Sequence, residues 1–133
     1  MLDKIFISPE IHMLVGSLVV LTTLLSMLLA GWLAWKTRET PNWGRGTYIL
    51  TQVVLMIQAL IGIKLLDQGL GTLQLYIHYV GGLAPLFFFM LVYWFPARNL
   101  KRRNWAMVAA ASMAFLFAFM SFGIGQLYVA GQA

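Results

Sequence analysis

The stretch "KTRETPNWGRG" (residues 36–46) separates two long apolar segments and decides how they are arranged. It is polar, and it contains Pro41 and Gly44, residues that are typical of turns. Two further stretches of this kind are "DQGLGT" (residues 67–72) and "PARNLKRRN" (residues 96–104). Connections this short keep consecutive helices adjacent and antiparallel. The sequence therefore predicts an up-and-down bundle.

The segments between these connections are long enough for a membrane. A helix needs about 20 apolar residues to cross a bilayer, and we predict such helices over residues 11–35, 47–66, 73–95 and 105–129. The chain has 133 residues, of which 61% are hydrophobic and only 10% are charged. A soluble domain of this size cannot bury so large an apolar fraction. We predict a single all-α domain over residues 1–133, an integral membrane four-helix bundle.

The basic residues predict the orientation of this bundle. Lys4 and Lys64 lie at one end, whereas the first and third connections hold the other seven of the nine: Lys36, Arg38, Arg45, Arg98, Lys101, Arg102 and Arg103. Cytoplasmic loops carry such an excess of Lys and Arg. We expect both termini on the outer, non-cytoplasmic side of a plasma or inner membrane, with lipid as a partner. The net charge of +5 is explained by topology, so we expect no nucleic-acid partner. The start, "MLDKIF", is not basic, which favours a retained first helix over a cleaved signal peptide.

The chain has only two histidines, and the topology predicts that they meet. His12 begins the first helix at the outer side, and His78 lies near the outer end of the third, which runs in the same direction. A glycine follows each one turn later, at Gly16 and Gly82. Two facing imidazoles can hold one iron through both axial positions, and the glycines leave room for a macrocycle. Without cysteine there is no covalent attachment motif, so we predict a b-type haem with His12 and His78 as its ligands.

Other residues allow both a functional and a simpler interpretation. Lys64, at the outer end of the second helix, and the hydroxyls of Tyr76 and Tyr79 are expected to face the haem propionates. Lys64 can equally be a boundary lysine that reaches the headgroups, as can His12. Small-residue spacing is also common where membrane helices simply pack closely. The fourth helix carries no evident chemistry, and "AMVAAASMA" (residues 106–114) predicts a packing face.

Three motifs carry a resemblance to a known family. They are "IHMLVG" (residues 11–16), "QALIGIKLL" (residues 58–66) and "LYIHYVGG" (residues 75–82). In this order and spacing, the chain resembles one four-helix half of the haem A synthase family, the cytochrome oxidase assembly proteins. The resemblance covers residues 9–95.

The resemblance implies that His12 and His78 match haem-iron ligands and that Gln58 and Gly62 belong to the helix between them. Gln58 can alternatively serve as an interhelical hydrogen-bond donor. The family enzyme has two such halves, and its catalytic half carries a glutamate where this chain has Pro9. The resemblance therefore supports haem binding and argues against this chain alone oxidising a haem methyl group.

Two classes of function follow from these observations. Filled axial positions favour electron transfer, or a haem A synthase-like subunit acting with other membrane subunits. The alternative is a non-catalytic accessory subunit of a respiratory or photosynthetic complex, and in a pigment-binding form of it each histidine would ligate a separate chlorophyll-type magnesium. The sequence leaves enzymatic activity open and favours none for this chain by itself.

Overall fold

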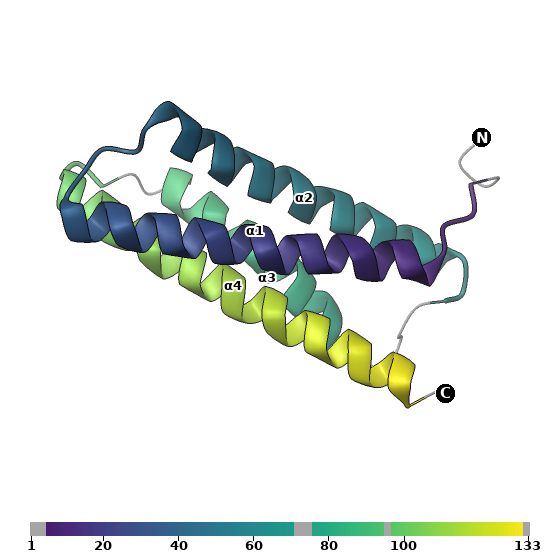
Figure 1. Cartoon of the computed structure of the whole chain (residues 1–133). Coiled ribbons are helices and arrows are strands. Elements are labelled where there is room, and N and C mark those ends of the chain that lie inside the picture. Colours follow the sequence, from purple (N-terminus) through teal and green to yellow (C-terminus); the bar gives the residue numbers. More distant parts are fainter. Residues whose placement is uncertain (1–4, 71–75, 95–96, 132–133) are drawn as a thin grey trace.

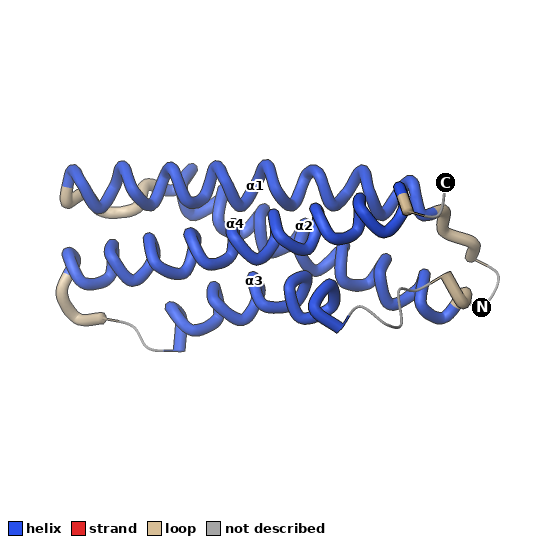
Figure 2. Tube along the Cα trace, turned by 90° about the horizontal axis from the view of Figure 1, so that it is seen from below, coloured by secondary structure: helices blue, strands red, loops and turns tan. Residues whose placement is uncertain are grey.

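A computed structural model describes residues 5–70, 76–94 and 97–131. It consists of four helices, α1 (Pro9–Lys36), α2 (Asn42–Asp67), α3 (Tyr76–Trp94) and α4 (Leu100–Ala130). They run up and down, so that α1 begins and α4 ends at the same end of the bundle (Figure 1). The view from below shows the connections at alternate ends (Figure 2). The prediction of an all-α four-helix bundle is confirmed.

Three helices begin earlier than predicted, and α1 does so by two residues, at Pro9 rather than at residue 11. The described α2 starts at Asn42 rather than at residue 47, and α4 starts at Leu100 rather than at residue 105. In α4, the Asn99 side chain accepts a hydrogen bond from the backbone N–H of Lys101 at 2.8 Å and so caps the helix. The apolar pattern marks only the length of a helix that lies within the membrane, and polar helical turns extend the helix beyond that length. For the third helix, residues 73–75 and 95 lie outside the described residues.

The end of α1 is closed by its own chain and by α4. Thr37 adopts a left-handed conformation with φ of 50°, and its N–H donates to the carbonyl of Ala34. The N–H of Arg38 donates to the carbonyl of Leu33 at 3.0 Å, which completes a helix-terminating turn. The side-chain amide of Asn104 donates to the carbonyls of Leu33 and Arg38, at 3.3 and 2.9 Å. This contact ties the start of α4 to the end of α1.

Small residues on α4 set the spacing of the bundle. Ala111, Ala114 and Ala118 are buried at intervals of three and four residues, so they share one helix face. Without larger side chains there, both α1 and α3 pack closely against α4. As a result α1 and α3 lie diagonally across the bundle, with Phe89 and Leu55 filling the space among the helices.

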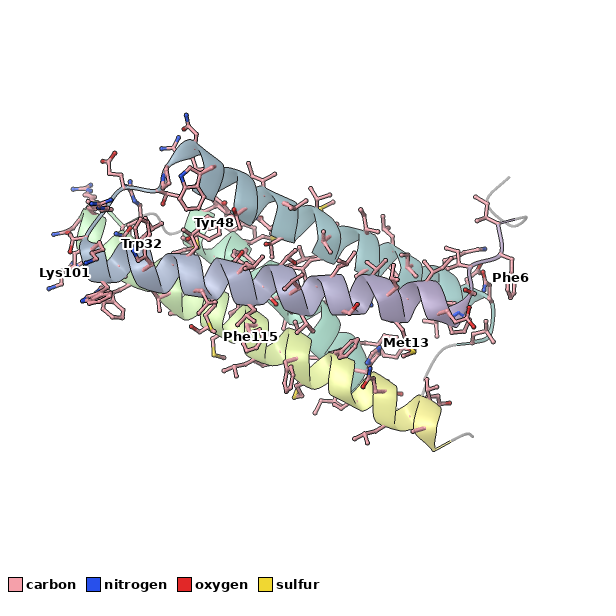
Figure 3. All side chains as sticks on the ribbon, viewed as in Figure 1. Phe6, Met13, Trp32, Tyr48, Lys101 and Phe115 are labelled. Carbon is pink, nitrogen blue, oxygen red and sulfur yellow. The ribbon has the colours of Figure 1, made fainter. Side chains whose placement is uncertain are left out.

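The outer surface is apolar. Leu28, Leu60 and Phe119 are 58%, 64% and 59% exposed, which a soluble protein would not sustain over whole helices. All four helices are long and apolar enough to cross a membrane. The chain is therefore a multi-pass membrane protein whose outer faces contact lipid. The end opposite the start of α1 carries the exposed tryptophans and basic residues, with Trp32 and Lys101 labelled in Figure 3.

We expect Ala114→Leu to destabilise the bundle by about 1–3 kcal/mol, because a larger side chain cannot fit where α4 meets its neighbours. The same substitution at the exposed Ala109 is the matched control and should have little effect, since that side chain points away from the bundle. The free energy of unfolding of both variants can be measured by SDS titration in detergent micelles. Equal stability of the two variants would contradict close packing at Ala114.

Candidate functional site

The two histidines meet inside the bundle. His12 belongs to the first turn of α1 and His78 to the first turn of α3, and both side chains are half-buried. Their ring centroids lie 6.0 Å apart, with 63° between the ring planes. Because α1 and α3 are diagonal neighbours, the imidazoles reach each other across the centre of the bundle. This is the pairing that the sequence predicted.

The proton position on His78 follows from its partner. Its Nδ1 lies 2.9 Å from the backbone carbonyl oxygen of Ser121 on α4. A carbonyl can only accept, so in the neutral ring this contact assigns the hydrogen to Nδ1 and leaves the lone pair on Nε2. The hydroxyl of Ser121 donates to the backbone carbonyl of His78 at 2.8 Å, which holds the two helices together at this point.

His12 has a weaker set of partners. Its Nε2 lies 3.3 Å from the amide nitrogen of Gln58 on α2, at the long end of the range for hydrogen bonds. Among the described residues, the buried Nδ1 of His12 and the buried Oε1 of Gln58 have no hydrogen-bond partner. Buried polar atoms are usually paired. The region around His12 therefore holds unused donors and acceptors.

Two glycines that the sequence analysis did not consider for this purpose make room for the imidazole rings. A side chain at Gly62 of α2 would begin 3.3 Å from Cε1 of His12, and one at Gly125 of α4 would begin 3.2 Å from Cε1 of His78. Gly16 instead leaves space for the amide of Gln58, which would lie 3.2 Å from an added Cβ. Gly82 faces the hydroxyl of Ser121, at 3.8 Å from an added Cβ. Each imidazole extends from its own helix toward a neighbouring one, so it lies against a glycine of that neighbouring helix.

A cavity of about 390 Å³ surrounds the histidines. This lies within the range of about 300–1,000 Å³ that is typical of small-molecule and cofactor sites. All four helices line it, and it lies in the half of the bundle where Met13 is labelled in Figure 3. Of the residues predicted for the site, the cavity is lined by His12, Gly16, Gln58, Gly62, His78, Tyr79 and Gly82.

Lys64 does not line this cavity. Its ammonium pairs instead with the Asp67 carboxylate at 2.6 Å, near the end of α2. Asp67 is exposed and Lys64 is half-buried, so the pair lies at the surface of the bundle. A role for Lys64 toward a cofactor would require it to leave this partner.

The comparisons with known proteins add no assignment. No protein-family model matches the sequence, and neither the curated proteins nor the solved structures gave a match. Within residues 5–70, 76–94 and 97–131, no three His, Cys, Asp or Glu side chains come together as a metal-binding group. Among the described residues, the site thus offers two imidazoles and no third side chain of these four types.

Two contributors on α4 were not anticipated from the sequence. Ser121 sets the tautomer of His78, and Gly125 makes room for its ring. The stretch "SFGIG" (residues 121–125) offered a signal, because a serine and a glycine four residues apart share one face of an otherwise apolar helix. The signal was weak, since nothing in the local sequence says which helix that face meets.

We expect the neutral imidazole of His78 to be protonated on Nδ1, because the carbonyl of Ser121 requires a donor there. Nitrogen-15 NMR of histidine-labelled protein at alkaline pH distinguishes the two tautomers, and His78→Gln assigns the signals. Ser121→Ala keeps the backbone carbonyl and should leave the tautomer unchanged, although it removes a helix-to-helix hydrogen bond worth about 0.6 kcal/mol in a membrane. A hydrogen found on Nε2 would refute the assignment.

Proposed function

We propose that the chain is an integral membrane protein that binds one b-type haem through His12 and His78. The observation that carries the proposal is the distance between the two imidazoles. Bonds of about 2 Å from each ring nitrogen to one metal ion, with the distance from nitrogen to ring centre added, separate the centroids by roughly 6 Å. The measured separation is 6.0 Å. Haem supplies four further nitrogen donors itself, which suits a site with only two protein ligands.

His78 has the arrangement that a metal ligand needs. A ligating histidine usually donates its second ring N–H to a carbonyl or carboxylate, which orients the ring. The carbonyl of Ser121 accepts that hydrogen bond, and the lone pair stays on Nε2. The hydroxyl of Ser121 holds α3 in place from the other direction.

For His12 to bind the metal through Nε2, the side chain of Gln58 has to move, and the hydrogen bond that is lost is weak. Coordination through Nε2 requires the Gln58 amide to turn away, at the loss of one long hydrogen bond. Such a bond contributes about 1 kcal/mol, a small loss that a bond from Nε2 to a metal ion can offset. The unpaired Oε1 of Gln58 then becomes an acceptor within the same cavity. We propose that Gln58 is the side chain that moves aside.

The cavity walls suit a flat, mostly apolar cofactor with one acidic edge. Gly16, Gly62 and Gly82 line the cavity together with apolar side chains. Tyr79 also lines it, and we propose that its hydroxyl faces the propionates at the end of the bundle. In this proposal Lys64 also binds a propionate, after its ammonium leaves the ion pair with Asp67.

The proposed activity is electron transfer. A haem with two histidine ligands supplies a one-electron carrier without an open coordination position. The protein residues hold the cofactor near one end of the bundle, exclude water with apolar walls and keep the His78 proton on Nδ1. We propose that the chain serves a respiratory or haem-modifying membrane complex, as a haem A synthase-like subunit would, and that it performs no catalysis alone.

We further propose that the His-bearing end faces outward from the cytoplasm, in a plasma or inner membrane. The support is the gathering of basic residues at the opposite end, where α1 and α3 end and α2 and α4 begin. Exposed tryptophans at that same end, including Trp35 and Trp43, are typical of an interfacial belt.

Protein purified from cells supplied with haem should show a reducible b-type haem spectrum. His78→Ala and His12→Ala should each lower haem content more than about tenfold, since even losing a hydrogen bond to a ligand costs about 10–100-fold in metal affinity. Ile77→Ala is the matched control, because that neighbouring side chain is 52% exposed. Added imidazole should restore the spectrum of a variant that folds but lacks one ligand.

Two outcomes of the same measurement would overturn the haem proposal. A colourless protein, after expression with ample haem, would favour an accessory subunit. Chlorin bands would favour a pigment-binding protein with magnesium on each histidine.

Reporter fusions test the orientation. Alkaline phosphatase joined after the last residue should be active, because that enzyme requires the non-cytoplasmic side, whereas a green fluorescent protein fusion there should stay dark when exported unfolded. Replacing Lys101, Arg102 and Arg103 together by Gln should reduce the bias, since about three fewer basic residues remain on the cytoplasmic side. An inactive alkaline phosphatase fusion together with a fluorescent green fluorescent protein fusion would show that the bundle is inverted.

A further inference from the structure

A second cavity lies at the opposite end of the bundle from the histidines. Its volume is about 370 Å³, and its walls come from the start of α2, the end of α3 and the start of α4. The polar side chains in its walls include Arg45, Tyr48, Tyr93, Arg103 and Asn104. Tyr48 is labelled in Figure 3, in the half of the bundle that also holds Trp32 and Lys101. The haem proposal uses none of these residues.

Tyr48 carries an unsatisfied hydroxyl. Its side chain is only 3% exposed, and its hydroxyl oxygen is buried without a hydrogen-bond partner among the described residues. The ring packs against Phe89, with centroids 6.4 Å apart, so the hydroxyl cannot turn out to water without losing this contact. Because buried hydroxyls normally have partners, the cavity that Tyr48 lines is the place where a partner is expected.

Most of the other polar groups of the cavity can donate hydrogen bonds. Arg45 and Arg103 lie exposed at its rim, from α2 and α4, and neither makes an ion pair with any described carboxylate. The hydroxyl of Tyr93 accepts a hydrogen bond from the amide of Gln52 at 3.4 Å, which leaves its own hydrogen available. The amide nitrogen of Asn104 is already occupied by backbone carbonyls of α1. A group that pairs with both guanidinium ions and both phenols is a hydrogen-bond acceptor, and the two positive charges favour a negatively charged one.

We propose that this cavity binds the phosphate of an anionic phospholipid headgroup. Phosphate accepts several hydrogen bonds at once and matches the planar fork of arginine. Basic pockets between membrane helices on the cytoplasmic side are suited to such headgroups. The remaining walls include Ile49, Val92 and Met107, which give an acyl chain an apolar path. Free phosphate shares the headgroup chemistry but has no use for these apolar walls.

The test uses the full-length protein stripped of lipid in a neutral detergent. Phosphatidylglycerol, phosphatidylcholine and inorganic phosphate are added separately, and bound lipid is counted by native mass spectrometry while thermal unfolding is followed. Phosphatidylglycerol should be retained and should raise the unfolding temperature, and the other two should do neither. An equal effect of inorganic phosphate would overturn the assignment to lipid, and an equal effect of phosphatidylcholine would overturn the role of the anionic charge.

Two variants locate the binding site. Arg103→Gln should lower phosphatidylglycerol retention about tenfold, the loss expected for one hydrogen bond to a charged group. Arg102→Gln, an adjacent exposed arginine that does not line the cavity, is the matched control and should retain lipid as the wild type does. Equal losses in both variants would mean that only the general surface charge matters, and the proposal would fail.

Tyr48→Phe keeps the ring and removes only the hydroxyl, so it tests the site even if Arg103→Gln does not fold. Without lipid the variant should be as stable as the wild type or more stable, because an unpaired buried hydroxyl is gone. With phosphatidylglycerol, the gain in unfolding temperature should shrink and lipid retention should fall. Wild-type retention in Tyr48→Phe would show that the hydroxyl does not contact the headgroup and would overturn the proposal.

Discussion

The close approach of α4 to two other helices determines where everything else lies. Alanines at positions 111, 114 and 118 present almost no side chain, so α1 and α3 both come near the α4 backbone. In a bilayer, helices associate through such packing and through hydrogen bonds, because lipid is as apolar as the helices themselves. With α1 and α3 held on either side of α4, their first turns bring His12 and His78 to a centroid separation of 6.0 Å.

Polar groups inside the bundle differ along its length in whether they have hydrogen-bond partners. Near the middle, Ser26 and Thr51 hydrogen-bond each other at 2.8 Å and join α1 to α2. Toward one end, by contrast, His12 and Gln58 leave buried atoms without partners among the described residues, and Tyr48 does so toward the other. Structural contacts in the middle are satisfied, and unsatisfied groups lie beside the two cavities. The two proposed ligands are placed where these unpaired groups lie.

The geometry bears on the resemblance to haem A synthase in one specific way. An electron carrier needs two strong axial ligands, whereas oxidation of a substrate needs an open position or a nearby acid or base. The candidate site offers two imidazoles, and in the resemblance noted from the sequence Pro9 stands where the family's catalytic half carries a glutamate. The proposed role is therefore haem binding and electron transfer rather than catalysis by a single chain.

The sequence by itself determined the number of helices, their membrane character and the histidine pairing. These follow from long apolar segments, short polar connections and the position of two residues along parallel helices, all of which are local or nearly local properties. It did not determine the true helix ends at Asn42 and Leu100, because polar turns continue a helix beyond its apolar part.

Only the tertiary structure decided which side chains complete the site. It assigned Ser121 and Gly125 of α4 to His78, assigned Gly62 of α2 to His12, and directed Lys64 to Asp67. The physical reason is that an imidazole reaches across to neighbouring helices, so its partners depend on how those helices are rotated about their axes. That rotation is decided by the packing of all four helices together.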